Sequence, residues 1–255
     1  MKFAPRALAG LAIALSVAGL ALAGCQKPGD DAFGKRVNAY LMAHPEVIRE
    51  AAVKLAENDR LAAAKASAAS LSKYRAQLER DPRDFVANPG GSVTVVEFFD
   101  YRCGYCKAAA PEVMKLIQEN PDVRFVLKEF PIFHQVSDTA AQAMLTPQAK
   151  AKGLDLYQAL MREPALNDAS LDRILAANGL DPAATRAAGE QPAIKRQILD
   201  TRGLASALKI DGTPAFIIGD TMIPGADIAA LKAAITQAKG GGLKHPSYPP
   251  VPAAT

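Results

Sequence analysis

Two cysteines, Cys103 and Cys106, are separated by two residues and directly follow a predicted strand, a spacing suited to thiol–disulfide exchange. Such exchange needs one thiolate that attacks a disulfide and a second thiol that resolves the mixed disulfide. If a helix begins at Cys103, its free N–H groups lower the pKa of that thiol below the usual ~8.5. We therefore expect Cys103 to attack and Cys106, one turn into the helix, to resolve.

A metal site is the main alternative for a close cysteine pair. A tetrahedral zinc site needs two further ligands, yet His44, His134 and His245 are the only histidines and lie far apart in the sequence. The cysteine pair could still bind Cu(I), which prefers sulfur ligands. The spacing therefore leaves exchange and Cu(I) binding open, and we expect neither zinc nor an organic cofactor.

An α/β core is predicted around the cysteine pair. Runs rich in β-branched and aromatic residues predict strands, and longer amphipathic segments predict helices. The strands are expected at 93–99, 123–130, 213–219 and 222–223, the helices at 103–119 and 227–239, and a helical block at about 137–209. This order predicts one α/β domain at 83–239 that carries a helical insertion.

The first 24 residues have the layout of an export signal. Lys2 and Arg6 precede an uninterrupted apolar run at 7–23, which is short for a membrane-spanning helix of ~20 residues. The run ends at Leu22-Ala23-Gly24-Cys25, which resembles the lipobox of bacterial lipoproteins, and this resemblance implies a lipid on Cys25. We expect a periplasmic protein anchored by that lipid, with a tether at 25–32. A signal anchor and ordinary secretion are the alternatives.

Residues 33–82 are alanine-rich and helical in pattern, with a break at His44-Pro45. Their apolar positions recur at spacings of three, four or seven, so one helix face needs a partner surface. This segment either packs on its own domain or joins copies of the chain into a homo-oligomer. The glycine- and proline-rich end, 240–255, is predicted to be disordered. The formal net charge is only +4, and nothing in the sequence indicates the clustered basic face that binds nucleic acid.

The active-site segment resembles that of thioredoxin-fold proteins. The run from Glu97 to Lys107 (EFFDYRCGYCK) contains the cysteine pair, and Pro111 follows it by five residues. Thr213-Pro214 resembles the family's cis-proline loop, and the helical block resembles the insertion of DsbA-type oxidoreductases. The resemblance covers residues 85–239. It implies a thioredoxin fold with an inserted helical domain, and a cis bond before Pro214 in a loop that pairs with the substrate backbone. A trans proline opening a strand is the alternative.

Glu97 lies inside an apolar strand, where an unpaired carboxylate is costly to bury. The resemblance to DsbA-like proteins implies that this acid assists proton transfer to the buried cysteine. It also implies an accompanying lysine on the next strand, which Lys128 matches. The alternative is that both side chains point to solvent.

The dipeptide Gly104-Tyr105 has no group that ionises near pH 7, so we expect Cys103 to be less acidic than in oxidases with a histidine there. Cys-Gly-Tyr-Cys with Thr213 before the proline resembles DsbC isomerases. A DsbA-like domain with an N-terminal helical extension resembles the suppressor-of-copper-sensitivity C (ScsC) proteins, of which some form trimers and others are monomers. These resemblances imply an isomerase or reductase of exported cysteine-containing proteins, kept reduced by a membrane thiol reductase. An oxidase with a membrane oxidase as partner, and a copper-tolerance protein, are the alternatives.

Overall fold

The computed structural model describes residues 29–241. The predicted export signal, Cys25, the first part of the tether and nearly all of the predicted tail lie outside these residues. The chain divides into two compact units, Met1–Leu61 and Ala62–Thr255. None of the helices within 29–241 is both long enough and apolar enough to cross a membrane.

The described part of the first unit is helical. Helix α1 (Gly29–Ala43) is followed by α2 (Glu46–Lys73), whose first 16 residues belong to this unit. The predicted break at His44-Pro45 is confirmed, because the two residues lie between the helices. Large apolar side chains are exposed along both helices: Phe33, Val37, Tyr40, Met42, Ile48, Val53, Leu55 and Leu61. This unit therefore presents apolar surface that its own described residues do not bury.

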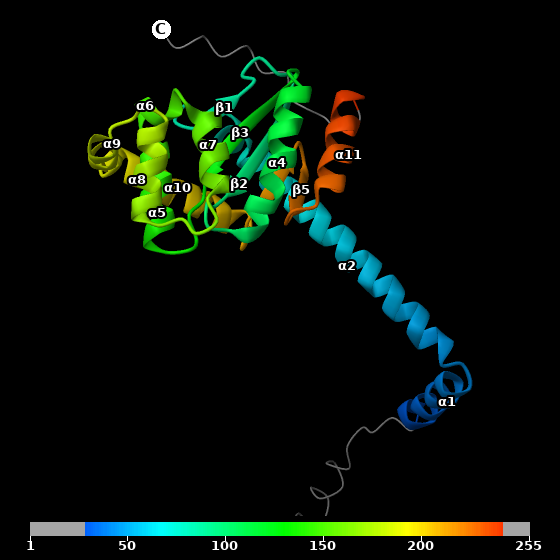
Figure 1. Cartoon of the computed structure of the whole chain (residues 1–255). Helices are drawn as coiled ribbons and strands as arrows, with labels where there is room; N and C mark the ends of the chain where they lie inside the picture. Colours follow the sequence, from blue (N-terminus) through cyan, green and yellow to red (C-terminus); the bar gives the residue numbers. More distant parts are fainter. Residues whose placement is uncertain (1–28, 242–255) are drawn as a thin grey trace, which may run out of the picture. The chain divides into compact units, whose positions relative to one another are not determined.

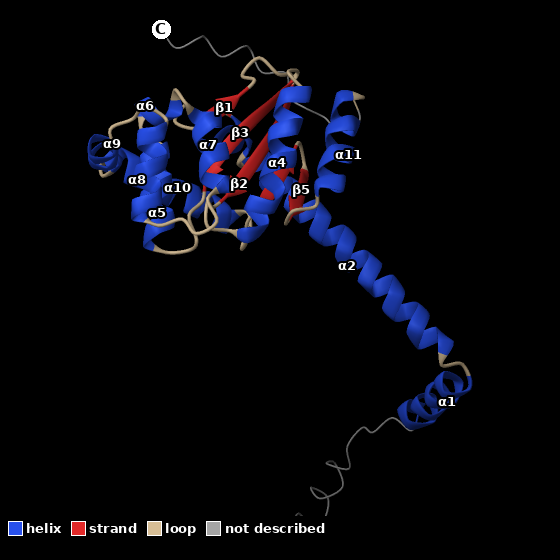
Figure 2. Ribbon diagram, viewed as in Figure 1, coloured by secondary structure: helices blue, strands red, loops and turns tan. Residues whose placement is uncertain are grey.

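The second unit is built on a five-stranded mixed sheet (Figure 2). Its strands are β1 (Phe85–Ala87), β2 (Val93–Phe99), β3 (Val123–Glu129), β4 (Ala215–Ile218) and β5 (Thr221–Pro224). The order across the sheet is β1-β3-β2-β4-β5; β2 and β3 are parallel and the other pairs are antiparallel. All seven residues of β2 are buried, so the strand that leads to Cys103 is central and covered on both faces.

Helices cover both faces of this sheet. On one face lie α4 (Gly104–Glu119) and α11 (Ile228–Lys239) (Figure 1). They pack against side chains such as Val95 and Phe99. On the other face, α3 (Arg75–Glu79) and the end of α10 (Pro192–Ala207) pack against Val96 and Phe98. Because strand side chains alternate, each face has its own apolar cluster.

The insertion between β3 and β4 is entirely helical. It consists of α5 (Gln135–Met144), α6 (Pro147–Lys150), α7 (Gly153–Arg162), α8 (Asp168–Ala177), α9 (Pro182–Gly189) and α10. Helix α7 packs against α4, the helix that begins at the cysteines. The predicted fold, a thioredoxin fold with an inserted helical domain and an N-terminal helical extension, is confirmed. Strand β1 was not predicted, since three residues are too few to show a periodicity.

Candidate active site

The two cysteines lie at the start of α4. Cys103 is the N-cap residue and its amide donates to the carbonyl of Asp100 at 3.1 Å, which forms a tight turn between β2 and the helix. Cys106 follows in the first helical turn, and both side chains are buried free thiols. The expected helix start is therefore present, and Pro111 lies inside the helix. The Cys103 sulfur lies where the unpaired N–H groups at the helix start can donate hydrogen bonds to a thiolate.

The two thiols have very different acidities. The pKa of Cys103 is lowered to about 5, first because its thiolate accepts a hydrogen bond from the Cys106 thiol. The Thr213 hydroxyl and the amides of Cys106 and Tyr105 add to this effect, while burial opposes it. Burial, followed by the hydrogen bond to Cys103, raises the pKa of Cys106 instead. At neutral pH the pair therefore consists of one thiolate and one thiol, which is what an attacking and a resolving cysteine require.

The loop opposite the cysteines begins with a cis peptide bond between Thr213 and Pro214, as predicted. In the thiol form, Cys103 Sγ donates to the Thr213 carbonyl at 3.1 Å. The Thr213 hydroxyl is buried and makes no hydrogen bond within residues 29–241. An unpartnered buried hydroxyl is costly, so this group is available as a donor once Cys103 has lost its proton.

Glu97 is fully buried on β2, on the same face of the sheet as α4. Its two carboxylate oxygens accept from the Tyr157 hydroxyl of α7, each at 3.2 Å. Burial raises the pKa of Glu97 to about 8, and the tyrosine opposes this shift. The charge of Glu97 in turn helps to raise the pKa of Cys106. Glu97 is thus near enough to the resolving cysteine to influence its pKa, and its own pKa is about 8.

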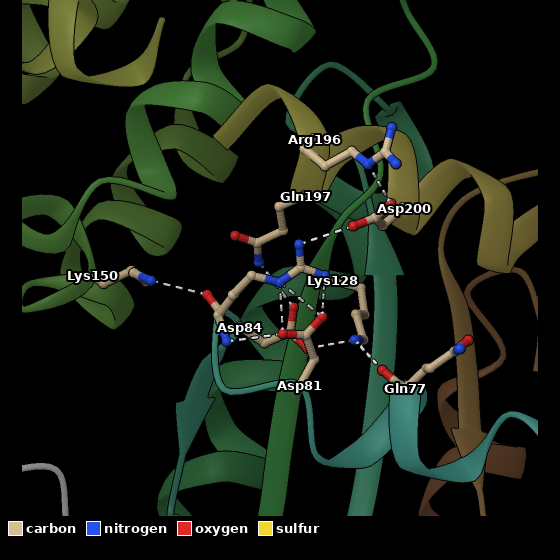
Figure 3. A network of polar contacts seen from close by, with 9 residues as sticks. Gln77, Asp81, Asp84, Lys128, Lys150, Arg196, Gln197 and Asp200 are labelled. Carbon is tan, nitrogen blue, oxygen red and sulfur yellow. Dashed lines mark hydrogen bonds and ion pairs between the residues drawn. The ribbon is translucent and has the colours of Figure 1, made fainter. Parts of the chain in front are cut away.

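The predicted pairing of Glu97 with Lys128 is wrong. The β2–β3 register places Glu97 beside Leu127 and Phe98 beside Lys128. Since successive side chains point to opposite faces, Lys128 lies on the face away from Glu97. Figure 3 shows Lys128 directed at Asp84 and Gln77.

The Lys128 ammonium forms a buried ion pair with Asp84 and donates to the Gln77 carbonyl at 2.6 Å. Burial raises the pKa of Asp84 to about 6, although Lys128 opposes this shift. Figure 3 places this pair in a polar network that joins the α3–β1 loop to α10 through Gln197. Lys128 therefore stabilises the far side of the sheet rather than the site.

A second buried acid, Glu129, lies on the face of β3 where the lysine was expected. It lies on the same face as Glu97, and Tyr101 donates to its Oε1 at 2.7 Å. Burial raises the pKa of Glu129 well above its usual value. Tyr101, Tyr157 and Glu129 line a cavity of about 10 Å³, which is at the lower limit for holding one water molecule. Sequence reasoning missed Glu129, although its two-residue offset from Leu127, the register partner of Glu97, indicates the shared face.

Two further residues of the site were missed. The Asp100 carboxylate, directly after β2, is only 2% exposed and accepts hydrogen bonds from the turn and from the loop after β3. Tyr157 resembles an ordinary core aromatic of an amphipathic helix, so no sequence signal distinguishes it. By contrast, Gly104 and Tyr105 are exposed, and a Cβ on Gly104 would meet no atom within 4 Å. The dipeptide is therefore free of packing constraints and open to a substrate.

Comparison with known sequences agrees with this geometry. A family model described as a DSBA-like thioredoxin domain matches residues 94–235, more than half of the chain. The chain belongs to this family. A second model, described as the copper resistance protein ScsC N-terminal domain, matches residues 31–62. The predicted resemblance to DsbA-like proteins with an ScsC-type N-terminal extension is confirmed.

Curated relatives match part of the chain. It is 30% identical over 181 residues to Na(+)/H(+) antiporter NhaA 1 of Salinispora arenicola, which covers 65% of this chain and 26% of that protein. It is 31% identical over 137 residues to the thiol:disulfide interchange protein DsbA of Bordetella pertussis, covering 51% of this chain and 64% of that protein. The chain thus spans about a quarter of the antiporter and about two thirds of this DsbA.

Solved structures resemble the DsbA-like domain, and several of them cover more of the chain. A thioredoxin-like oxidoreductase from Silicibacter pomeroyi is 37% identical, with a TM-score of 0.62, covering 65% of this chain and 98% of that one. BcfH from Salmonella enterica Typhimurium is 33% identical, with a TM-score of 0.69, covering 82% and 96%. The catalytic domain of Proteus mirabilis ScsC is 27% identical, with a TM-score of 0.61, covering 67% and 97%. These likenesses support a thiol–disulfide oxidoreductase of the DsbA or ScsC type.

Proposed function

We propose that the chain is a thiol–disulfide oxidoreductase of exported proteins that acts as a disulfide isomerase or reductase. The observation that carries this proposal is the Cys103 thiol at the start of α4, with a pKa of about 5. That value lies between ~3.5 for the strongly oxidising DsbA and ~7 for the reducing thioredoxin. Because Gly104-Tyr105 adds no positive charge, the disulfide is held with intermediate strength. An isomerase needs such a balance, since it attacks as a thiolate and must also leave the substrate again.

The proposed reaction begins when the Cys103 thiolate attacks a substrate disulfide. A bond forms between Cys103 Sγ and one substrate sulfur, and the other substrate sulfur leaves as a thiolate with the electron pair. In isomerisation, a substrate thiolate then attacks the mixed disulfide and Cys103 leaves as a thiolate. In reduction, Cys106 loses its proton, bonds to Cys103 Sγ, and the substrate sulfur leaves. We assign the exchange of the Cys106 proton to Glu97, whose pKa of about 8 allows it to give or take a proton near neutral pH.

The N-terminal helices are proposed to join copies of the chain through residues 33–82. Phe33, Val37 and Tyr40 recur at i, i+4 and i+7 on α1, so their exposed side chains share one helix face. The match of residues 31–62 to the ScsC N-terminal model supports a role of this unit beyond the thioredoxin fold. Several active sites on one oligomer would favour isomerisation, since a mispaired substrate meets a second thiolate before it diffuses away.

The proposed location is the periplasm, with the chain anchored by lipid at Cys25 and kept reduced by a membrane thiol reductase. The support for the location is the sequence of residues 1–25, with its basic start, apolar run and lipobox-like end. The proposed substrates are exported proteins that contain cysteines.

The refolding of scrambled ribonuclease tests the proposal. We expect the reduced wild type to restore ribonuclease activity, and the Cys103→Ser, Cys106→Ser double variant to be inactive. A variant that lacks residues 33–61, which belong to the first unit, should elute as a monomer and isomerise more slowly, while it still reduces small disulfides. Isomerisation no better than that of the double variant would overturn the isomerase assignment.

Two other functions each have an observation in their favour. The likeness to the Bordetella DsbA favours a dithiol oxidase, and a reduction potential near about −120 mV together with rapid oxidation of reduced ribonuclease would support it. The match to a domain named for copper resistance favours Cu(I) binding by Cys103 and Cys106. A tight one-to-one Cu(I) complex without isomerase turnover would support that function instead.

A further inference from the structure

The carboxylate of Asp100 joins the turn before Cys103 to the loop after β3. Its Oδ1 accepts from the Arg102 amide at 2.7 Å and from the Ser137 hydroxyl at 2.8 Å. Its Oδ2 accepts from the amides of Ile132 at 2.7 Å and Phe133 at 3.1 Å. All four partners are donors, so the arrangement fits an ionised carboxylate, which only accepts. One side chain therefore fixes two backbone segments that are about 30 residues apart in sequence.

Three side chains form hydrogen bonds to the loop of residues 131–134. In addition to Asp100, the Arg102 side chain donates to the Phe133 carbonyl at 2.9 Å. The Arg202 side chain, from α10, donates to the Pro131 carbonyl at 2.8 Å. Both backbone polar groups of Phe133 are thus bonded to residues of the turn that leads to Cys103. The position of this loop relative to the attacking cysteine is therefore fixed.

The features of this loop are unfavourable for stability alone. His134 has a φ of 69°, which is strained for a residue other than glycine. Phe133 is 40% exposed, although burying its side chain would stabilise the fold. Such a combination is typical of a segment that is held in place for binding.

We propose that Asp100 is a positioning residue for the exchange reaction. Through its hydrogen bonds to the 131–134 loop, it fixes the backbone of Phe133 beside the Cys103 turn, so that this exposed residue is a fixed contact for protein substrates. The occupant of this contact is an apolar side chain next to the cysteine of an unfolded exported protein. Tyr105, which is 74% exposed, offers a second aromatic surface within the cysteine motif itself. This inference rests on the proposed exchange function and adds a determinant of substrate choice to it.

Asp100→Asn and Phe133→Ala test the inference, alone and together. The asparagine has nearly the same shape, but its NH₂ group must face at least one backbone N–H. Because both groups are donors, at least one of the hydrogen bonds to the backbone is lost. The readout is the rate at which the reduced full-length chain reacts with two disulfides, scrambled ribonuclease and 2-hydroxyethyl disulfide. The rate with the small disulfide reports on the reactivity of Cys103 alone, whereas the rate with ribonuclease also depends on its contact with the 131–134 loop.

We expect each variant to lose about tenfold in rate with ribonuclease and markedly less with the small disulfide, since only the placement of the protein substrate is disturbed. The double variant should be no slower than the slower single variant, because both changes remove the same contact. Additive losses, or equal losses with both disulfides, would overturn the inference. A wild type that reacts with neither disulfide would instead overturn the proposed function, and this inference with it.

Two further variants complete the design. Ser137→Ala removes one of the four hydrogen bonds to Asp100 and keeps the charge, so we expect a loss of about threefold with ribonuclease only. If Asp100→Asn does not fold, the pair of Ser137→Ala and Phe133→Ala decides the question by the same criterion of non-additivity. Asp122→Asn is the matched control, because its carboxylate is exposed and pairs with Lys239 at the surface, and it should react at the wild-type rates.

Discussion

The reduction potential of the Cys103–Cys106 pair should depend on pH, and the slope of that dependence should change near pH 5. Above that pH the reduced form carries a Cys103 thiolate and a Cys106 thiol, so reduction takes up one proton; below it, reduction takes up two. For a two-electron couple each proton contributes about 30 mV per pH unit. The potential should therefore fall by about 60 mV per unit below pH 5 and by about 30 mV per unit above it.

The assay is equilibration of the chain with a lipoate redox buffer at each pH, followed by acid quenching and alkylation to count free thiols. From pH 5 to pH 8 the expected total fall is about 90 mV, against about 180 mV for two ordinary thiols. The Glu97→Gln variant is the control, because removing that acid should leave the break near pH 5 in place. A uniform slope of about 60 mV per unit up to pH 8 would refute the lowered pKa of Cys103.

Three substitutions extend the test. Thr213→Val removes a hydroxyl that stabilises the thiolate, so the pKa of Cys103 should rise by about one unit, seen in the ultraviolet absorbance of the thiolate; an unchanged pKa would contradict this role. Glu97→Gln should stabilise the protein against urea by about 3 kcal/mol at pH 7. The pKa of Glu97 is about 8 in the folded state and near 4.5 in the unfolded state, so between these pH values ionisation of the unfolded chain favours unfolding, and glutamine removes this effect. The gain should vanish below pH 4.5, and its persistence there would contradict the raised pKa. Lys128→Met should lower the free energy of unfolding by about 3–5 kcal/mol, because Asp84 loses its buried partner. The folded variant should still react with 2-hydroxyethyl disulfide near the wild-type rate. A tenfold loss of that rate would show that Lys128 contributes to the active site.

The sequence was sufficient for the features that depend on local pattern. The apolar run at Val93–Phe99 predicted the central strand with its observed bounds, and the cysteine spacing predicted the helix start. Thr213-Pro214 was identified through a family resemblance, because a cis bond leaves no mark in composition or periodicity.

The sequence was not sufficient for contacts that depend on which face of a strand a residue occupies. Lys128 was paired with Glu97 through the resemblance to DsbA-like proteins, in which a lysine on the next strand accompanies the acid, yet the register places the two residues on opposite faces. Glu129, one position further, shares the face of Glu97. Asp100 was missed because its partners, such as Ile132 and Ser137, come from a loop and a helix whose approach is set only by the tertiary fold.

The trapping of mixed disulfides tests most directly whether Cys103 is the attacking thiol. A Cys106→Ser variant retains the attacking thiolate but cannot resolve the intermediate. When it is mixed with scrambled ribonuclease, a covalent adduct that a reductant releases should accumulate. The Cys103→Ser variant, tested like the first with Cys25 also replaced by serine, should form almost none, because its Cys106 thiol is buried and has a raised pKa. Adducts formed equally by both variants, or only by Cys103→Ser, would contradict the account.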